Sequence, residues 1–478
     1  MASRLRYPVP PLLAATLGPL LLFVLLERFP AWNPILRVPI HHFYAISMTF
    51  LLTGLLAAAV AWAGRRLRNL QVVLLALAFV SLAVFLAVHG WTTPGVLHHG
   101  NVLFTLSVHG ALLTGNLFLW LSSLPSDIRL MGWIERRQVV LVFGWITLLA
   151  GYACVALLAP ERFEPVTLAA PPASWLLTAA GALLAGDATY RFLQGYRYAR
   201  LPLQGALAFT AAWLGTAHGM AAFSEMWRAS WWLYHGLLLA AAATVTWGLL
   251  RQFTRGGSLS GALQGLFLSD PLERLRHGLS GGVAELVAAT ERHDPHTAGH
   301  TYRVARLAVR LGEEMGLQPE HLRALAQGAM LHDIGKIRVP REVLNKPGPL
   351  SEAEYQLVQQ HPEHGYQIAR LLGTLSDELD VIRYHHERWD GRGYPKGLKG
   401  EQIPLLARIL SVADVYDALT SARPYREAWP EDQALAYIRA EAGKQFDPSC
   451  VAAWERLHAR QRNELLAILA AAPECGKA

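Results

Sequence analysis

The sequence predicts an all-α protein made of a bundle of about eight transmembrane helices followed by an all-helical domain. Three observations predict this fold class. The first half consists of apolar stretches, each long enough to cross about 30 Å of hydrocarbon as a helix of roughly 20 residues. Arginines occur in every second connection between these stretches. From residue 291 onward the pattern is helical, with few β-branched alternations.

The apolar stretches and their flanking arginines predict the topology. Cytoplasmic connections of membrane proteins are rich in basic residues. The Arg-rich connections therefore place the amino terminus and everything after residue 251 in the cytoplasm, at a cell membrane. The expected spans are approximately 9–26, 40–63, 70–89, 101–122, 138–159, 174–193, 203–223 and 230–250. The Arg groups are Arg4 and Arg6; Arg65, Arg66 and Arg68; Arg129, Arg136 and Arg137; Arg197 and Arg200; and Arg251 and Arg255.

Other interpretations of the first half fit less well. The first span could be a signal peptide, but Glu27, Arg28, Phe29 and Pro30 follow it without a small-residue cleavage pattern, so we expect an anchor. A buried soluble core would not explain alternating arginines. A transporter is disfavoured because the spans lack obvious internal repeats and paired charges. We expect Asp187 to pair with Arg191 one turn later.

Charge is divided unevenly between the two halves. The chain of 478 residues has a net charge of +7, and the part before residue 256 holds 17 arginines against seven acids. The basic character thus belongs to the apolar half rather than to a soluble face that would bind DNA or RNA. The three cysteines are widely spaced and odd in number, which predicts neither a disulfide framework nor a Cys-based zinc site.

Eight histidines lie in the apolar half. Imidazoles in a membrane suit a metal or haem iron. No ligand-like spacing recurs, however, so we interpret them as interfacial groups at the headgroup level, like Trp91, Trp231 and Trp232. They are His41, His42, His89, His98, His99, His109, His218 and His235.

The composition divides the chain into four segments. Residues 1–253 form the expected membrane domain, 254–284 a linker and connecting helix, 285–460 a catalytic domain and 461–478 a tail. Leucines in the connecting helix recur at three-to-four spacing, and this stripe either pairs with its twin in a homodimer or packs on the following domain. The stripe consists of Leu268, Leu272, Leu275, Leu279 and Leu286.

Histidines and acids gather in five clusters after residue 291. Imidazoles and carboxylates without thiolates favour Fe, Mn or Zn over a soft metal. Two metals near 4 Å apart can ionise a water and neutralise an attacked phosphate, and a lysine one turn after a ligand would add a fixed cation. The clusters are HDPHTAGH (293–300), LHDIGK (331–336), HPEHG (361–365), HH (385–386) and VADVYDA (412–418).

Residues 285–460 resemble the HD-GYP family of HD-domain metal phosphohydrolases. His332-Asp333 corresponds to the HD pair and Gly393-Tyr394-Pro395 to the GYP signature. The resemblance implies hydrolysis of cyclic di-GMP to the linear dinucleotide and leaves open a second cleavage to GMP. It also implies two or three divalent ions, Fe or Mn, as cofactors. It implies these metal ligands: His300, His332, Asp333 as the bridging and catalytic carboxylate, His361, His385, His386 and Asp414.

The resemblance also implies substrate contacts. Lys336 would contact the scissile phosphate, and Arg423 and Arg426 would hold phosphates through a fork that matches their oxygens. Tyr394 would lie against the ligand. Asp417, one turn after Asp414, is expected behind the metal ligands or in contact with the substrate.

One position departs from the family pattern. Members with a third metal carry a Glu four residues before the first ligand His, and this sequence has His296 there. His296 is a candidate third-metal ligand with a different charge, so two ions are better supported than three. Two alternative functions stay open: a receptor that only binds nucleotide or a partner protein, and an HD hydrolase of another nucleotide.

Overall fold

The computed structural model divides the chain into two compact units, Met1–Ser269 and Asp270–Ala478. Within the described part of the chain both units are helical, with two isolated β-bridges as the exceptions. The structure describes residues 9–67, 69–96, 102–126, 128–163, 172–256, 258–264, 266, 281–294, 299–371, 376–421 and 427–470.

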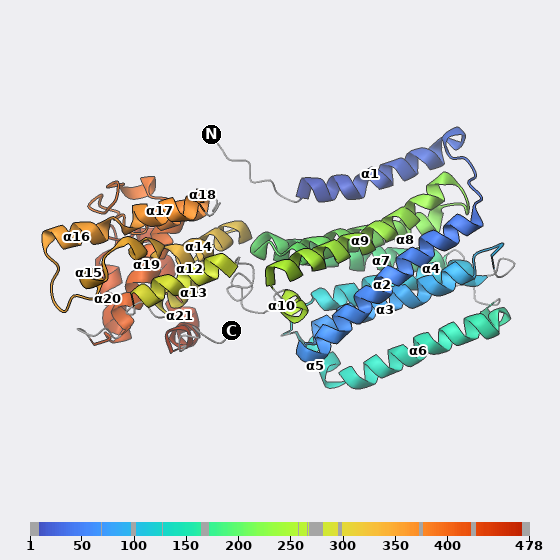
Figure 1. Ribbon diagram of the computed structural model, residues 1–478, viewed down its shortest axis with the longest axis horizontal. Coiled ribbons are helices and arrows are strands. Elements are labelled where there is room, and N and C mark those ends of the chain that lie inside the picture. The colour runs from blue at the N-terminus through green and yellow to red at the C-terminus, as the bar shows by residue number, and fades with distance from the viewer. Residues whose placement is uncertain are drawn as a thin grey trace. The chain divides into compact units, whose positions relative to one another are not determined.

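The N-terminal unit is built from long helices joined by short connections (Figure 1). Only two residues lie between the end of α2 and the start of α3, and these two helices pack side by side. The helices of this unit are α1 (Val9–Arg28), η1 (Pro30–Trp32), α2 (Pro39–Leu67), α3 (Leu70–Trp91), α4 (Val102–Ser123), α5 (Arg129–Arg136), α6 (Gln138–Leu158), η2 (Pro160–Phe163), α7 (Ala173–Ala199), α8 (Pro202–Phe223), α9 (Ala229–Gly256) and α10 (Leu259–Gln264).

Six of these helices close into a ring. Helix α2 packs on α3, α3 on α4, α4 on α7, α7 on α8, α8 on α9, and α9 returns to α2. Helices α1 and α6 lie outside the ring, against α8 and α9 and against α3 respectively. Their outward faces carry exposed large apolar side chains such as Leu21 and Val140, which suits contact with lipid rather than water.

Membrane-spanning character is shown for fewer helices than the sequence predicts. Every expected span coincides with a helix, but in the described residues six helices, α1, α2, α3, α4, α6 and α9, are long and apolar enough to cross a bilayer. Helices α7 and α8 are less apolar, because α7 carries Asp187 and Arg191 and α8 carries Gln204 and His218. The expected pair is confirmed: Arg191 Nε donates to Asp187 Oδ2 at 2.8 Å.

The C-terminal unit is a cluster of shorter helices around α13 and α19. Helix α13 packs on α14, α19 and α21, and α14 packs on α18. The core therefore lies among the helices whose ends carry the predicted ligands. The helices of this unit are α12 (Gly281–His293), α13 (His300–Glu314), α14 (Pro319–Leu331), η5 (Ile334–Arg338), α15 (Arg341–Leu344), α16 (Glu352–Gln359), α17 (His361–Leu371), α18 (Ser376–Tyr384), η6 (Gly400–Gln402), α19 (Leu405–Thr420), α20 (Glu431–Ala440) and α21 (Pro448–Ala470).

Candidate metal centre

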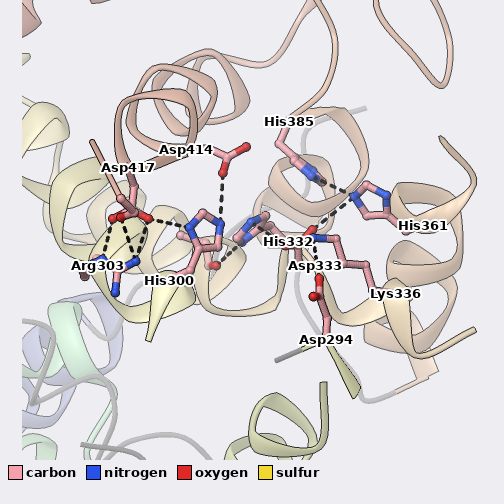
Figure 2. A network of polar contacts seen from close by, with 12 residues as sticks. Asp294, His300, Arg303, His332, Asp333, Lys336, His361, His385, Asp414 and Asp417 are labelled. Atoms are coloured by element: carbon pink, nitrogen blue, oxygen red, sulfur yellow. Dashed lines mark hydrogen bonds and ion pairs between the residues drawn. The ribbon is translucent and has the colours of Figure 1, made fainter. Parts of the chain in front are cut away.

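Most of the predicted ligands lie at helix ends in the C-terminal unit. His300 begins α13 and His361 begins α17, while His332 and Asp333 follow α14 directly. The tandem histidines follow α18 in the same way. Helix ends project side chains past the last turn, so several helices can direct ligands toward one point. Figure 2 shows His300, His332, Asp333, His361, His385 and Asp414 around a common centre.

Three of the histidines are oriented by the same backbone contact. The Nδ1–H groups of His332, His361 and His385 donate to the carbonyl oxygens of Ala329, Val358 and Ile382, at 2.7, 2.7 and 2.8 Å. Each carbonyl lies three residues before its histidine. A hydrogen bond at Nδ1 fixes the tautomer and leaves the Nε2 lone pair for a metal ion. All three imidazoles are therefore prepared as ligands.

Asp333 lies between two of these imidazoles. Its Oδ1 is 3.3 Å from His361 Nε2, and its Oδ2 is 3.5 Å from His332 Nε2. The Oδ2 atom also accepts from Lys336 Nζ at 2.7 Å, and Lys336 Nζ lies 3.3 Å from Asp294 Oδ2. A carboxylate that presents one oxygen to each of two imidazoles is suited to bridge two ions.

Gly335 allows this approach between η5 and α17. A Cβ atom at position 335 would lie 1.9 Å from the His361 carbonyl oxygen and 2.5 Å from the Gly365 nitrogen. Real Cβ atoms do not approach backbone atoms so closely, so only glycine fits. The glycine of the LHDIGK motif thus brings Asp333 to His361.

His300 is held between two carboxylates of α19. Its Nδ1 is 2.7 Å from Asp417 Oδ2, and its Nε2 is 3.2 Å from Asp414 Oδ1. Arg303 donates to both Asp417 oxygens, at 2.6 and 3.0 Å, and to Ser421 Oγ. Asp417 therefore lies behind His300, on the side away from Asp414, where it fixes the ring.

The GYP turn folds back over the tandem histidines. A Cβ atom at Gly393 would lie 2.4 Å from the Arg388 nitrogen and 2.6 Å from the His386 carbonyl oxygen. The Tyr394 ring lies 4.9 Å from the His386 ring, between centroids. Glu387 is buried, and its two oxygens accept from the backbone nitrogens of residues 396 and 398 at 2.7 and 2.9 Å. Gly393 and Glu387 together set the position of Tyr394.

Burial and charge keep most of the histidines neutral. Burial lowers the pKa of His332, places that of His385 well below its usual range and lowers that of His386 to about 3. Burial also disfavours a charged His300, but hydrogen bonds to Asp414 and Asp417 outweigh it and raise its pKa to about 9. A metal ligand must be unprotonated, so neutral imidazoles are the form that binds an ion.

The carboxylate and the amine beside these histidines are both charged. Burial works against ionisation of Asp333, but the charge of Lys336 holds its pKa well below its usual range. Burial likewise opposes a charged Lys336, but Asp333 and Asp294 raise its pKa to about 12. The site therefore combines a fixed anion with a fixed cation at neutral pH.

The donor set fits divalent metal ions. Two groups, His300 with His332 and Asp333, and His361 with His385 and His386, each offer three ligand atoms within 4.8 Å of one another. The buried Nε2 of His332 has no hydrogen-bond partner in the described part of the chain. Asp333 lies between His332 of one group and His361 of the other. Neutral imidazoles with carboxylates suit Fe, Mn or Zn.

A cavity of about 670 Å³ opens beside this centre. Its volume is typical of a pocket for a small molecule. Cations and metal-type side chains share its wall with apolar residues of the segment between η5 and α17. The lining includes His300, Asp333, Lys336, Lys346, Leu350, His386 and Asp414.

Sequence reasoning missed two residues of this site. Arg303, one turn after His300, orients Asp417, and Asp294 pairs with Lys336. Asp294 belongs to the HDPHTAGH cluster, so its position offered a signal, whereas Arg303 offered only its spacing from His300. His296, Arg423 and Arg426 lie outside the described residues.

The family comparison matches residues 286–450 to an HD domain. The C-terminal unit is an HD domain. Its HD pair is His332-Asp333, and the resemblance drawn from the motifs is confirmed.

The names of several relatives of this domain describe phosphodiesterases of cyclic dinucleotides. The chain is 47% identical over 183 residues to the cyclic di-GMP phosphodiesterase response regulator RpfG of Xanthomonas campestris pv. campestris, covering 37% of this chain and 47% of that protein. It is 43% identical to the cyclic di-GMP phosphodiesterase PA4108 of Pseudomonas aeruginosa, covering 32% of this chain and 37% of that protein. It is 40% identical to 3'3'-cGAMP-specific phosphodiesterase 3 of Vibrio cholerae, covering 34% of this chain and 35% of that protein. The chain spans less than half of each relative.

Proposed function

We propose that the chain is a membrane-anchored phosphodiesterase that hydrolyses cyclic di-GMP to linear pGpG and on to GMP. The observation that carries the proposal is the convergence of five histidines and two aspartates beside Lys336. Four of these side chains, His300, Asp333, His386 and Asp414, line the cavity together with Lys336. The names of the relatives support a cyclic dinucleotide as the substrate.

The seven predicted ligands would hold two divalent ions, Fe or Mn. His300, His332 and Asp333 form one group of donors, and His361, His385 and His386 form the other. Asp414 faces His300 and would complete the first group. Ions in this site would lower the pKa of a water molecule and offset the negative charge of a phosphodiester. A third ion would need His296.

The protein groups around the centre would bind and orient the dinucleotide. The Lys336 ammonium is held at 2.7 Å from Asp333 and lines the cavity, so a phosphate next to Asp333 would meet a fixed cation. Tyr394, set by the GYP turn, offers an aromatic ring beside His386 for a base. Arg423 and Arg426 are expected to hold the remaining phosphate oxygens.

Arginines support the proposed orientation of the membrane unit. Arg66, Arg137 and Arg251 stack on Trp62, Trp133 and Trp247 at 4.5, 4.6 and 5.6 Å from the ring centroids. These pairs occur at the end of α2, just before α6 and near the end of α9, the ends that the topology places in the cytoplasm. Arginine and tryptophan are typical of the membrane interface. We propose eight passes, regulation of the phosphodiesterase by this unit, and a homodimer.

The test compares two substrates on the same protein. The full-length chain in detergent is incubated with Mn²⁺ and either cyclic di-GMP or 3'3'-cGAMP, and the products are separated by chromatography. Linear pGpG from cyclic di-GMP at the higher kcat/KM supports the proposal. Preference for 3'3'-cGAMP would match the relative with that specificity. Tight binding without turnover would favour the receptor alternative.

A further inference from the structure

Three buried histidines meet in the N-terminal unit, in a place unrelated to the HD domain. His42 lies near the start of α2, His89 near the end of α3 and His235 near the start of α9. Each offers a ring nitrogen within 4.8 Å of the others, and their side chains are 0 to 4% exposed. The sequence interpretation placed these three at the headgroup level and did not predict that helix packing buries them together.

Backbone carbonyls orient two of the rings. His89 Nδ1–H donates to the Phe104 carbonyl oxygen at 2.7 Å, and His235 Nδ1–H donates to the Trp231 carbonyl oxygen at 3.1 Å. Both rings therefore keep an unprotonated Nε2. That of His89 is buried and lacks a hydrogen-bond partner among the described residues. A buried acceptor without a partner destabilises the fold unless a cation or donor satisfies it.

The third ring adds another lone pair to the same point. Thr93 donates its hydroxyl hydrogen to the Gly90 carbonyl oxygen at 2.6 Å, so Thr93 Oγ1 accepts from His42 Nδ1, 2.9 Å away. His42 Nε2 is then unprotonated and faces His235 Nε2 at 2.9 Å. Two nitrogen lone pairs at this distance repel unless a cation lies beside both. The alternative, in which His42 Nε2–H donates to His235, still leaves His89 Nε2 unpartnered.

We propose that His42, His89 and His235 bind a divalent first-row transition-metal ion such as Zn²⁺ or Cu²⁺. Neutral imidazoles suit these ions, whereas Mg²⁺ and Ca²⁺ prefer oxygen. Three protein ligands leave a further coordination position open. The orienting contact, Nδ1–H to a backbone carbonyl, is the one that prepares His332, His361 and His385 in the HD domain.

The surroundings of the three histidines form a fixed apolar shell. Trp231 lies 5.0 Å from the His42 ring and 4.2 Å from the His235 ring, between centroids, and Phe104 stacks on His89 at 4.2 Å. The loop before α2 is fastened to the start of α9 by Asn33, whose side chain bonds Ser230. These contacts hold the helix ends that carry the ligands, so the site is preorganised for an ion.

The test introduces a thiolate that reports only this site. His89→Cys is made in the full-length chain, and Co²⁺ is added to the protein in detergent. A Cys ligand to Co²⁺ produces an intense sulfur-to-metal band in the near ultraviolet, and none of the predicted HD-domain ligands is a cysteine. The matched control is His41→Cys, which places a thiol on the exposed neighbour of His42.

The proposal expects the band in His89→Cys at one equivalent of Co²⁺, its loss when His235→Gln is added, and its absence in wild type and His41→Cys. Wild-type protein is also expected to retain one more Zn²⁺ per chain than His89→Gln. If His89→Cys does not elute as folded protein, His235→Cys is used in its place in the same assay. Folded His89→Cys and His235→Cys without the band, together with equal Zn²⁺ content in wild type and His89→Gln, would overturn the proposal.

Discussion

The carboxylate of Asp333 faces His361 with Oδ1 at 3.3 Å and His332 with Oδ2 at 3.5 Å. His361 begins α17 and His332 directly follows α14, and they belong to the two different groups of candidate ligands. A single side chain thus joins both halves of the site. Its loss should affect every ion that binds there, not only one.

Asp333→Asn removes the charge that both halves share. Loss of a residue that merely supports a ligand costs about 10–100-fold in metal affinity, and loss of a bridging ligand should cost more. We expect at least a 100-fold lower rate of cyclic di-GMP hydrolysis and less bound Mn, measured by mass spectrometry of the metal. Asp432→Asn, an exposed acid on α20, is the control. Full metal content and activity in Asp333→Asn would contradict a bridging role.

Asp417→Asn tests whether this carboxylate positions His300 or contacts substrate. Asp417 lies 2.7 Å from His300 Nδ1 and accepts two hydrogen bonds from Arg303. Removal of such a partner should weaken metal affinity about 10–100-fold. We expect hydrolysis to recover in excess Mn²⁺ with an unchanged KM. A raised KM at saturating Mn²⁺ would instead assign Asp417 to the substrate.

Gly393→Ala should displace the GYP turn. The new methyl group would lie 2.4 Å from the Arg388 nitrogen, so the turn must move and take Tyr394 away from His386. A misplacement of about 1 Å can cost roughly 100-fold in rate. We expect a fall of that order in kcat/KM. Lys396→Ala, an exposed side chain in the same turn, serves as the comparison and should behave as wild type.

Glu378→Ala should destabilise the HD domain without touching the metal centre. Glu378 is 1% exposed and its Oε1 lies 2.6 Å from Arg323 Nη1, which is also buried. An uncompensated buried charge costs about 3–5 kcal/mol. Thermal inactivation of hydrolysis should occur about 6–20 °C lower. The control is Glu401→Ala, which changes an exposed side chain and should leave the midpoint temperature of inactivation unchanged. An unchanged midpoint in Glu378→Ala would show that the Glu378–Arg323 ion pair contributes nothing to stability.

The HD domain could be predicted far better than its supporting contacts. The predicted ligands follow a recognisable order of motifs, so the sequence singled out His300 and Asp414 although α13 and α19 lie far apart in the chain. Arg303 belongs to no such pattern, and its role depends on α19 packing beside α13. The close approach at Gly335 likewise depends on packing of η5 against α17.

The membrane unit was predicted at the level of its helices. Hydropathy and arginines identified the eight long helices in the described part of this unit, because both signals are local in sequence. Convergence of His42, His89 and His235 was not predicted, because it depends on α2 packing against both α3 and α9. The spacing of these histidines along the chain does not indicate that packing.

The most direct measurement is hydrolysis of cyclic di-GMP as a function of Mn²⁺ added back to chelator-treated full-length protein. We expect no turnover in the stripped protein and recovery of linear pGpG formation as Mn²⁺ fills the site, with no recovery in Asp333→Asn. Turnover that persists after stripping, or that returns equally in Asp333→Asn, would contradict a metal centre built by these seven side chains.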